Sequence, residues 1–400
     1  RVTWLRVLIG ILLIVLVCLC NRGSKYEDET SAWPNSSLHQ PTSGLDPPQA
    51  DAVHVAAIVT GVHACHQTLT MLKSMLYHMG RYKENTGFGC SVQPLHGNTS
   101  GRRAFNQLTH LPPPSPLHLL LHLIVDNQSH RFMARQFGEW NISGVRVEYY
   151  GVEKYKKLVD HIKSGHYAGS LGYIKLFLPN ILPKYVTQVI ALDTDILFNE
   201  DIRRLWAIFK HFNNSQAIGM VQDHNPYLRD DIGGLYWPDW VNGYNAGILL
   251  LHLERLRNTS WDSQWKNAFH TLRSEIGTLP TGEQDVLNLA VYREKGLLYE
   301  LPCEWNLQMG AFSWIPECPV TWVPFQSTND VTFSQPGGVN IRRLKLAHFN
   351  AHIKPEDYYP KPWRLPAMNA VNGALKKREL AWTYIRAYYQ LRGMEKACFR

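Results

Sequence analysis

Two nucleotide-binding signatures are missing from this 400-residue chain. It contains neither a GxGxxG turn nor a Walker sequence, so dinucleotide oxidoreductases and P-loop enzymes lose their usual support. It also lacks a long basic run and an RNA-binding aromatic motif, although its formal net charge is +8. Nucleic-acid binding is therefore not expected, whereas a basic site for a phosphorylated or acidic substrate stays open.

Cysteines are few, and none of their spacings is typical of a zinc site. Cys303 and Cys318 bracket one loop and are the pair we expect to form a disulfide in an oxidising compartment. The other five are left without a predicted partner: Cys18, Cys20, Cys65, Cys90 and Cys398.

The N-terminal block Trp4–Cys20 is apolar, with Arg1 and Arg6 near its start. Its length suits a short membrane span or the core of a signal peptide. No A-x-A cleavage site follows, which favours an uncleaved anchor at residues 1–20 with a cytoplasmic amino end and a lumenal remainder. Six N-x-S/T sequons suit a lumenal location: Asn35, Asn98, Asn127, Asn141, Asn213 and Asn258.

Composition divides the rest of the chain. Residues 21–51 are polar and rich in Pro and Ser, which predicts a flexible stem. Residues 52–365 alternate strand and helix patterns, and residues 366–400 are predicted to be a C-terminal extension with a helix over Ala374–Leu391. The segment Gly80–Pro116, which contains a PPPSP run, is predicted to be a disordered insertion.

Apolar runs predict strands, and amphipathic segments predict helices. The expected strands are His54–Gly61, Leu117–Asp126, Val145–Tyr150, Val186–Phe198, Ala217–Gln222, Tyr244–Leu253 and Leu344–Phe349. The expected helices are Gln67–His78, Arg131–Trp140, Gly172–Leu182 with a disturbance at Pro179, Ile202–Phe212, Trp261–Leu272 and Gly282–Arg293. This alternation predicts an α/β fold with a mostly parallel central sheet flanked by helices. Ligands of such sheets bind at the carboxyl ends of the strands.

The predicted strand Val186–Phe198 contains Asp193-Thr194-Asp195. Residues i and i+2 of a strand project to the same side, so Asp193 and Asp195 would point at one place. Two carboxylates that close repel each other, and a divalent cation held by oxygen ligands would neutralise them. The alternative is an Asp-rich turn that hydrogen-bonds to local backbone N–H groups.

Three further segments combine polar groups with a strand end or a helix start: Tyr244–Gly247 (YNAG), Gly282–Asp285 (GEQD) and His348–Pro355 (HFNAHIKP). Each has a simpler explanation. Asn245 suits an ordinary turn, Thr281 and Gln284 suit a capping box, and Lys354 suits an exposed surface. Their occurrence in this order, together with the Asp pair, favours one shared site.

Together these motifs resemble those of the family 8 glycosyltransferases of the GT-A fold, and most of all the xylosyltransferase half of the LARGE-type xylosyl- and glucuronyltransferases. The resemblance runs from about His54 to the HFNAHIK segment, without the insertion. The segments that carry it are HYAGSLGYIKLFLPNILP (His166–Pro183), VIALDTDILF (Val189–Phe198), YNAGILLLHLERLR (Tyr244–Arg257), EQDVLN (Glu283–Asn288) and LPCEWNLQ (Leu301–Gln308).

The resemblance implies a single GT-A domain over residues 52–365 that binds a UDP-sugar and Mn²⁺. Asp193, Asp195 and His348 would bind the Mn²⁺, and Asp193 would also belong to the nucleotide-sugar site. Lys354 would contact the diphosphate, six residues after His348. Further contacts to the donor nucleotide are implied at the end of the first strand, at Thr60 and Gly61.

The resemblance also implies the residues around the transferred sugar. Lys175 would lie near the diphosphate and the sugar, and Asn245 and Glu283 would line the sugar. Gln284 would occupy the position where a retaining mechanism has its nucleophile-like group. The family usually has Asp where this chain has Glu283, so the carboxylate here lies one methylene further out.

The implied activity is the metal-dependent transfer of xylose from UDP-xylose to a glycan acceptor with retention of configuration, and the acceptor is expected to be a protein-linked glycan. The implied location is the Golgi membrane, in a single-pass type II orientation. Two alternatives stay open: a glucosyl- or galactosyltransferase of the same family, and an inactive sugar-binding relative. Polymerisation by this chain alone is not implied, because the related bifunctional proteins carry a second, glucuronyltransferase domain. The segment Asn225–Trp240 suggests an aromatic surface for the acceptor, and nothing indicates the oligomeric state.

Overall fold

The structure is a computed structural model of the whole chain. It describes residues 52–82, 90, 119–159, 162, 164–165, 169–224, 234–238, 240, 243–309, 318, 320–321, 333–334, 340–350, 354–357 and 377–399. The predicted anchor, the stem, most of the Gly80–Pro116 insertion and most of the Asn225–Trp240 segment lie outside these residues. Within them, no helix is long and apolar enough to cross a membrane.

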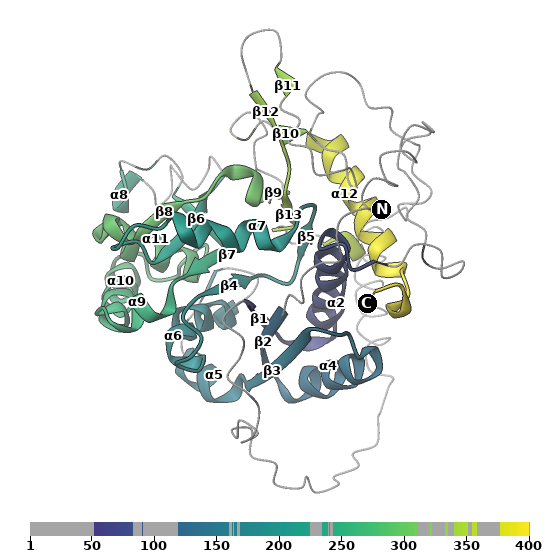
Figure 1. The fold of residues 1–400 in the computed structure, drawn as a ribbon. Coiled ribbons are helices and arrows are strands. Elements are labelled where there is room, and N and C mark those ends of the chain that lie inside the picture. The colour runs from purple at the N-terminus through teal and green to yellow at the C-terminus, as the bar shows by residue number, and fades with distance from the viewer. Residues whose placement is uncertain are drawn as a thin grey trace, which may run out of the picture. The chain divides into compact units, whose positions relative to one another are not determined.

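A seven-stranded sheet forms the centre of the fold (Figure 1). Its strands, in spatial order, are β3 (Val145–Gly151), β2 (Leu119–Val125), β1 (Val53–Val59), β4 (Val189–Leu192), β7 (Tyr244–Leu251), β6 (Ile218–Gln222) and β8 (Leu298–Glu300). Neighbouring strands are parallel except for β7, which is antiparallel to both β4 and β6. The predicted α/β fold with a mostly parallel sheet is therefore confirmed.

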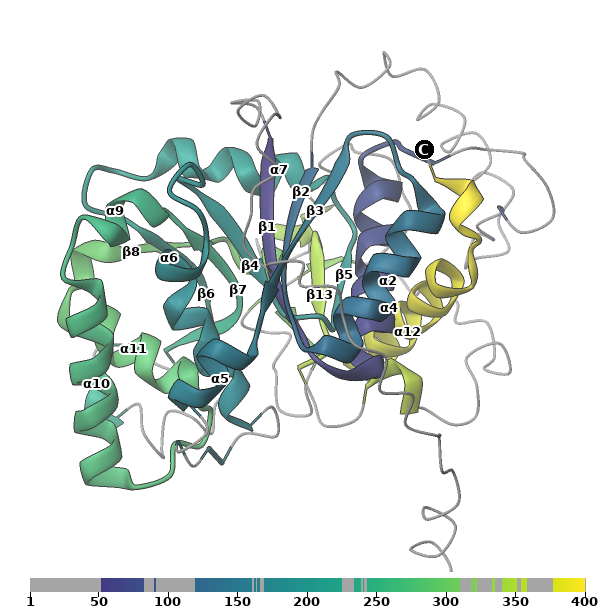
Figure 2. The same cartoon turned by 90° about the horizontal axis from the view of Figure 1, so that it is seen from below.

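Helices cover both faces of this sheet (Figure 2). One face carries α2 (Gly61–His78), α4 (Asn127–Trp140), α7 (Ile202–Trp206) and α12 (Lys377–Gly393). The other carries α5 (Glu153–Val159), α6 (Leu178–Ile181), α9 (Leu253–Arg257), α10 (Trp261–Ile276) and α11 (Glu283–Arg293). Shorter helical segments are α8 (Gly234–Tyr236), η2 (Gly169–Phe177), η3 (Ala207–His211), η5 (Lys295–Leu297), η6 (Cys303–Trp305), η8 (Pro355–Asp357) and η10 (Lys396–Cys398).

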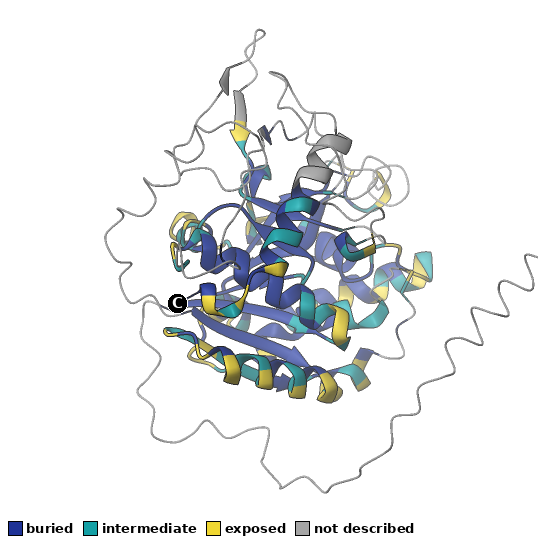
Figure 3. Ribbon diagram, turned by 90° about the vertical axis from the view of Figure 1, so that its right-hand side faces the viewer, coloured by how far each residue is buried: buried dark blue, intermediate teal, exposed yellow. Residues whose placement is uncertain are grey.

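The sheet separates two hydrophobic cores because its strands are buried on both sides (Figure 3). In β1, Val55 and Ala57 pack into the core under α2, whereas Ala56 between them packs into the core under α10 and α11. This alternation follows from the two-residue period of a strand. It explains why β1, β2 and β4 are continuous apolar runs in the sequence.

The predicted strand Val186–Phe198 is wrong as one element. It splits into β4 and a separate strand β5 (Ile196–Phe198), with Asp193-Thr194-Asp195 between them. β5 leaves the central sheet and pairs antiparallel with β13 (Leu346–His348), which also pairs with β9 (Leu307–Gln308). A third small sheet consists of β10 (Val320–Thr321), β12 (Asn340–Arg343) and β11 (Phe333–Ser334).

The prediction of a helix disturbed at Pro179 is also corrected. The chain forms η2 first, and α6 then begins with Pro179 in its first turn. A proline has no N–H to lose there, because the first N–H groups of a helix have no intrahelical partner. Pro179 therefore stands at the start of a helix and does not interrupt one.

The structure has two disulfides among its described residues, one that closes a local loop and one that joins segments 308 residues apart. Cys303–Cys318 confirms the predicted pair, and Cys90–Cys398 links the insertion to the C-terminal segment. The latter lies beside α12, whose Tyr384, Tyr388 and Leu391 are buried in the same core as α2. The C-terminal helix is thus packed against the rest of the domain.

A buried histidine pair joins β1 to β2. Nδ1 of His54 lies 3.0 Å from Nε2 of His122, and Nδ1 of His122 lies 2.9 Å from the Tyr150 hydroxyl, which donates to Glu148. Because the Tyr150 proton points at Glu148, its oxygen accepts from His122, and His122 in turn accepts from His54. Both imidazoles are therefore neutral in this arrangement.

Acid should weaken the fold through this pair. Burial lowers the pKa of His54 to about 4, and burial together with His54 and Arg146 lowers that of His122 to about 3. Below pH 6.5 both histidines bind a proton in the unfolded chain but stay neutral in the folded protein. The free energy of unfolding is therefore highest above pH 6.5 and decreases as the pH falls towards 4. At pH 5 we expect a loss of about 2 kcal/mol for each histidine.

Urea unfolding at pH 7 and pH 5 measures this effect. The double variant His54→Gln/His122→Gln should lose much less stability between the two pH values than the parent protein. Glutamine stays neutral and still donates and accepts hydrogen bonds. His270→Gln, at an exposed position on α10, is the control. An unchanged pH dependence in the double variant would show that the pair is not the cause.

Candidate active site

Polar residues from several strands meet at the carboxyl edge of the central sheet. Asp193 follows β4, and Asp223 follows β6. Because β7 is antiparallel, its first residues lie at this same edge, and Asn245 pairs with Val221 of β6. The predicted binding edge of the sheet therefore receives groups from three adjacent strands.

Asp193, Asp195 and His348 form a cluster suited to a metal ion. Each offers one ligand atom, and these atoms all lie within 4.8 Å of one another. Nε2 of His348 lies 3.5 Å from Oδ2 of Asp193 and 3.4 Å from Oδ1 of Asp195. Pairing of Ile196 in β5 with His348 in β13 places the histidine beside Asp195. Carboxylate oxygens and one imidazole suit a divalent cation such as Mn²⁺.

Two lysines contact the carboxylates from opposite sides. Nζ of Lys175 lies 2.6 Å from Oδ1 of Asp193, and Nζ of Lys354 lies 2.5 Å from Oδ2 of Asp195. Burial raises the pKa of both carboxyls, but these lysines and His348 outweigh it and hold both pKa values below their ordinary range. Burial likewise lowers the pKa of His348, but the two carboxylates raise it to about 9. Both aspartates are therefore ionised and able to bind a cation at neutral pH.

A chain of hydrogen bonds sets the orientation of His348. The backbone N–H of Gly247 donates to Oδ1 of Asn245, which also accepts from Nδ2 of Asn306 at 2.9 Å. The other amide atom of Asn306, its oxygen, then faces Nδ1 of His348 at 3.1 Å. A backbone N–H can only donate, so Nδ1 of His348 carries a proton and Nε2 is the nitrogen that faces the carboxylates. This is the orientation that a metal ligand needs. With the pKa of His348 raised to about 9, Nε2 is protonated as well at neutral pH, and a bound cation would displace that proton.

Lys175 ties the metal-binding cluster to Glu283. Its ammonium also donates to Oε1 of Glu283 and to the carbonyl of Ala246, each at 3.0 Å, which accounts for all three of its protons. The opposing carboxylates raise its pKa despite the lowering effect of burial. Glu283 in turn fits only because residue 172 is glycine: a Cβ there would lie 2.1 Å from Oε2 of Glu283.

The amide of Gln284 is bonded at both ends. Its oxygen accepts from Nδ2 of Asn245 and from the backbone N–H of Ala246, each at 3.1 Å, and its nitrogen donates to Asp223 at 2.9 Å. The simpler explanation of a capping box formed by Thr281 and Gln284 does not hold, because the amide of Gln284 bonds to Asn245, Ala246 and Asp223. Thr281 bonds instead to Asp285, whose pKa is raised to about 7 mainly by burial.

Thr60 and Gly61 lie at the carboxyl end of β1, which is adjacent to β4 in the sheet. The N–H of Gly61 donates to Asp126 at 3.0 Å and to Ser129 at 2.9 Å, both in the loop and helix that follow β2. The edge position agrees with a role in nucleotide binding, but the described contacts do not join these two residues to the metal-binding cluster. Their role stays a prediction.

Sequence reasoning missed three residues that shape the site. Asp223 holds Gln284, Asn306 holds His348, and Asn288 clamps the backbone of Tyr244 by accepting from its N–H and donating to its carbonyl. Asp223 had a usable signal, since it directly follows a predicted strand. Asn288 and Asn306 lie in two of the segments that carry the family resemblance, EQDVLN and LPCEWNLQ, but their partners are distant in the sequence and no role was assigned to either.

The C-terminal helix α12 holds the turn that carries Lys354. Glu356 accepts from the hydroxyl of Tyr388 and, at 3.0 Å, from the Arg392 guanidinium. The hydroxyl of Tyr389 donates to the carbonyl of Pro355 at 3.0 Å. The predicted C-terminal extension thus contributes to the position of a diphosphate-binding candidate.

Gly247 leaves the space that His348 occupies, so it offers a sharp test of the metal-binding cluster. A Cβ on residue 247 would lie 2.0 Å from Cε1 of His348 and 2.6 Å from its Nδ1. Gly247→Ala should therefore displace the imidazole and weaken Mn²⁺ binding at least about tenfold, as loss of a metal-orienting group does.

Calorimetry of Mn²⁺ binding in the presence of UDP measures the change. Gly138→Ala is the control, because a Cβ at that position on α4 meets nothing within 4 Å. Equal Mn²⁺ affinity in both variants would contradict the assignment of His348 as a ligand.

The fold and motifs have known counterparts. The chain is 32% identical over 280 residues to human xylosyl- and glucuronyltransferase LARGE2, covering 68% of this chain and 33% of that protein. It is 31% identical over 277 residues to human LARGE1, covering 68% of this chain and 31% of that protein. The chain thus spans about a third of the length of the curated relatives it matches.

A solved structure shares the fold. Mouse xyloside xylosyltransferase 1, in its apo form, aligns with a TM-score of 0.50 and 18% sequence identity over 75% of this chain and 98% of that chain. The predicted GT-A glycosyltransferase fold is confirmed. Residues 99–358 match the model of "Glycosyl transferase family 8", which is more than half of the sequence. The chain belongs to glycosyl transferase family 8.

Proposed function

We propose that this glycosyltransferase moves xylose from UDP-xylose to a glycan acceptor, with retention of configuration and with the help of Mn²⁺. The observation that carries the proposal is the convergence of Asp193, Asp195 and His348 between Lys175 and Lys354. With a divalent cation bound, this arrangement would place positive charge where a diphosphate leaves, and electrostatic stabilisation of the leaving group is most of what glycosyl transfer requires.

The leaving UDP carries the charge that the site must stabilise. A divalent cation held by Asp193, Asp195 and His348 would neutralise the developing charge on the diphosphate. Lys354 has its ammonium beside Asp195 and can exchange part of that contact for a phosphate oxygen. Lys175 is buried among two carboxylates and a carbonyl, so it positions Asp193 and Glu283 more than it binds phosphate.

Gln284 supports retention by charge placement. An amide oxygen has two lone pairs, and both are engaged by Asn245 and the backbone of Ala246. A covalent bond from this oxygen to the sugar would use one of these lone pairs and so sacrifice at least one of the two hydrogen bonds. We therefore propose that Gln284 holds a fixed partial negative charge beside the anomeric carbon, and that Asp223 holds Gln284 in place.

Xylose is favoured over hexoses for two reasons. The named relatives are xylosyl- and glucuronyltransferases, and the quoted motifs resemble the xylosyltransferase half. Xylose also lacks the C6 hydroxymethyl of glucose, and the longer Glu283 side chain narrows the pocket. Its carboxylate lies wedged between Lys175 and Gly172 and cannot easily retract.

The proposed location is the Golgi lumen, with a type II anchor at residues 1–20. The two disulfides support an oxidising compartment, because such bonds do not persist in the cytosol.

Metal dependence is the first test of this function. UDP release in the presence of an acceptor should disappear with EDTA and return with Mn²⁺. Asp195→Asn should abolish turnover, because it removes a ligand charge, while leaving the thermal unfolding midpoint close to that of the parent. Asp262→Asn, in an exposed ion pair on α10, is the matched control. Full activity in excess EDTA would contradict the metal assignment.

An Asp195→Asn protein with normal UDP release would favour the sugar-binding alternative.

Donor choice is the second test. Glu283→Asp should raise UDP-glucose turnover relative to UDP-xylose, because one methylene of extra space is worth roughly 1–3 kcal/mol, or about 10–200-fold. Glu275→Asp on exposed α10 is the matched control. A parent enzyme that prefers UDP-glucose or UDP-galactose would refute the xylose assignment but leave the family. Equal slowing of every donor in Glu283→Asp would show that Glu283 only holds a sugar hydroxyl.

A further inference from the structure

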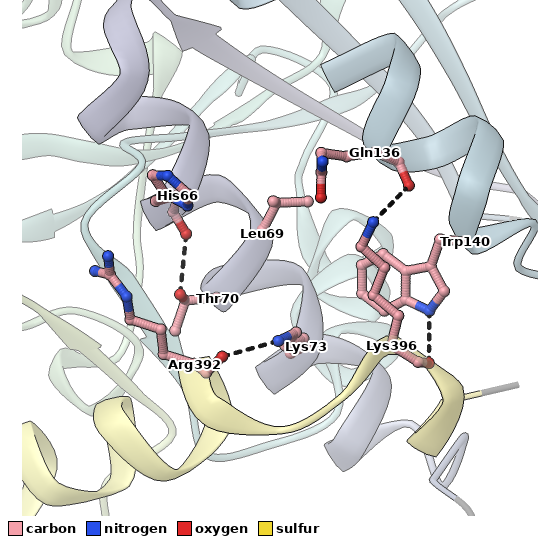
Figure 4. A pocket seen from close by; sticks show the side chains of 8 residues that line it. All are labelled: His66, Leu69, Thr70, Lys73, Gln136, Trp140, Arg392 and Lys396. Carbon is pink, nitrogen blue, oxygen red and sulfur yellow. Dashed lines mark hydrogen bonds between the residues drawn. The ribbon is translucent and has the colours of Figure 1, made fainter. Parts of the chain in front are cut away.

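A polar cavity lies away from the donor site, between α2, α4, the end of α12 and the segment that follows it (Figure 4). Its volume is about 170 Å³. The polar side chains that line it are His66, Thr70 and Lys73 from α2, Gln136 and Trp140 from α4, Arg392 from α12, and Lys396 from the segment that follows α12. Among the described contacts, none joins these residues to the metal-binding cluster, although Arg392 also bonds to Glu356 in the turn that carries Lys354.

The cavity has more positive charge than its surroundings neutralise. Lys396 pairs with Glu139 at 2.9 Å, and Arg392 pairs with Glu356 at 3.0 Å. Lys73 has no such partner: among the described residues, no carboxylate forms an ion pair with its ammonium. It donates instead to the carbonyls of Arg392 and Met394, at the end of α12.

Burial of the Lys73 ammonium in this position is energetically unfavourable. Only 9% of its surface is exposed, so its ammonium has lost most of its hydration. Burial, together with Lys396 and Arg392, lowers its pKa to about 8. Carbonyl dipoles at a helix end compensate a cation only in part. A buried cation beside two others is stabilised most by an anion that all three reach.

We propose that this cavity binds a tetrahedral oxyanion, phosphate or sulfate, either as the free ion or as an ester on a larger molecule. The volume matches the space of about five or six waters, at roughly 30 Å³ for each water, and such an anion has five heavy atoms. Lysine and arginine N–H groups are the donors that phosphate oxygens prefer.

The anion site is distinct from the diphosphate site. Helix α2 begins at Gly61, at the carboxyl edge of the sheet, and Lys73 lies twelve residues further along it. At about 1.5 Å per residue, this places Lys73 roughly 18 Å from the start of the helix. A single diphosphate cannot occupy both places.

Thermal unfolding in sodium phosphate, sodium sulfate and sodium chloride at equal ionic strength tests the proposal. The midpoint of the parent protein should rise with phosphate and sulfate beyond its rise in chloride, because a ligand that binds only the folded state stabilises it. Lys396→Gln should raise the half-saturating phosphate concentration about tenfold, the typical loss for one charged hydrogen bond. Lys73→Met should have the same effect, but it also removes hydrogen bonds to the end of α12. The test therefore rests on Lys396→Gln.

Two controls separate this site from the rest of the surface. Lys266→Gln removes a lysine that is likewise paired with a carboxylate, on exposed α10, and Lys354→Gln removes a lysine of the donor site. Both should keep the response of the parent to phosphate. Loss of the response in Lys354→Gln but not in Lys396→Gln would assign it to the donor site and overturn the proposal, as would equal midpoints in phosphate, sulfate and chloride.

A final arm distinguishes the two sources of the anion. Glucose 6-phosphate, titrated in the same way, should bind more tightly than inorganic phosphate if the natural ligand is an ester. Weaker binding of the ester assigns the cavity to the free ion. In either case, Lys396→Gln should raise the half-saturating concentration of the ligand. An unchanged half-saturating concentration in this variant would contradict the proposed site.

Discussion

The site depends on holding two carboxylates against each other at the end of a buried strand. Asp193 and Asp195 repel, and burial strengthens that repulsion because little water screens it. The protein meets this constraint by surrounding the pair with cationic groups: Lys175 on one side, Lys354 on the other, and His348 between them. The same charge balance makes the position receptive to a divalent cation and to the diphosphate that such a cation binds.

Two features of the fold position the side chains of the site: the antiparallel direction of β7, and the departure of the chain from the central sheet after β4. The antiparallel direction of β7 brings Asn245 to the edge where the parallel strands end. The chain leaves the central sheet after β4 and pairs with β13 instead, which sets His348 opposite the start of β5. The amides of Asn245 and Asn306 connect a backbone N–H to the imidazole and fix its orientation, so Nε2 of His348 faces the carboxylates.

Local patterns predicted the strands and the Asp pair, the family resemblance supplied the roles of the other site residues, and long-range pairing accounts for what both missed. Apolar runs are enough to find β1, β2 and β4, because each is buried on both faces. The break between β4 and β5 was not predictable from such a run, since both strands are equally apolar and only the pairing partner differs. Gln284 matched a capping box, but its amide found stronger partners in Asp223 and Asn245. Asn306 lies in the LPCEWNLQ segment that carries the family resemblance, but its role depends on His348 and Asn245, which are distant in the sequence.

Anomalous diffraction from crystals grown with MnCl₂ and UDP is the most direct measurement of the central claim. The account predicts one Mn²⁺ peak within coordination distance of Asp193, Asp195 and His348, with the diphosphate on its open side. For such ligands, coordination distances are about 2.0–2.6 Å. A structure with UDP bound and Mn²⁺ located elsewhere, or with His348 turned away from the ion, would contradict it.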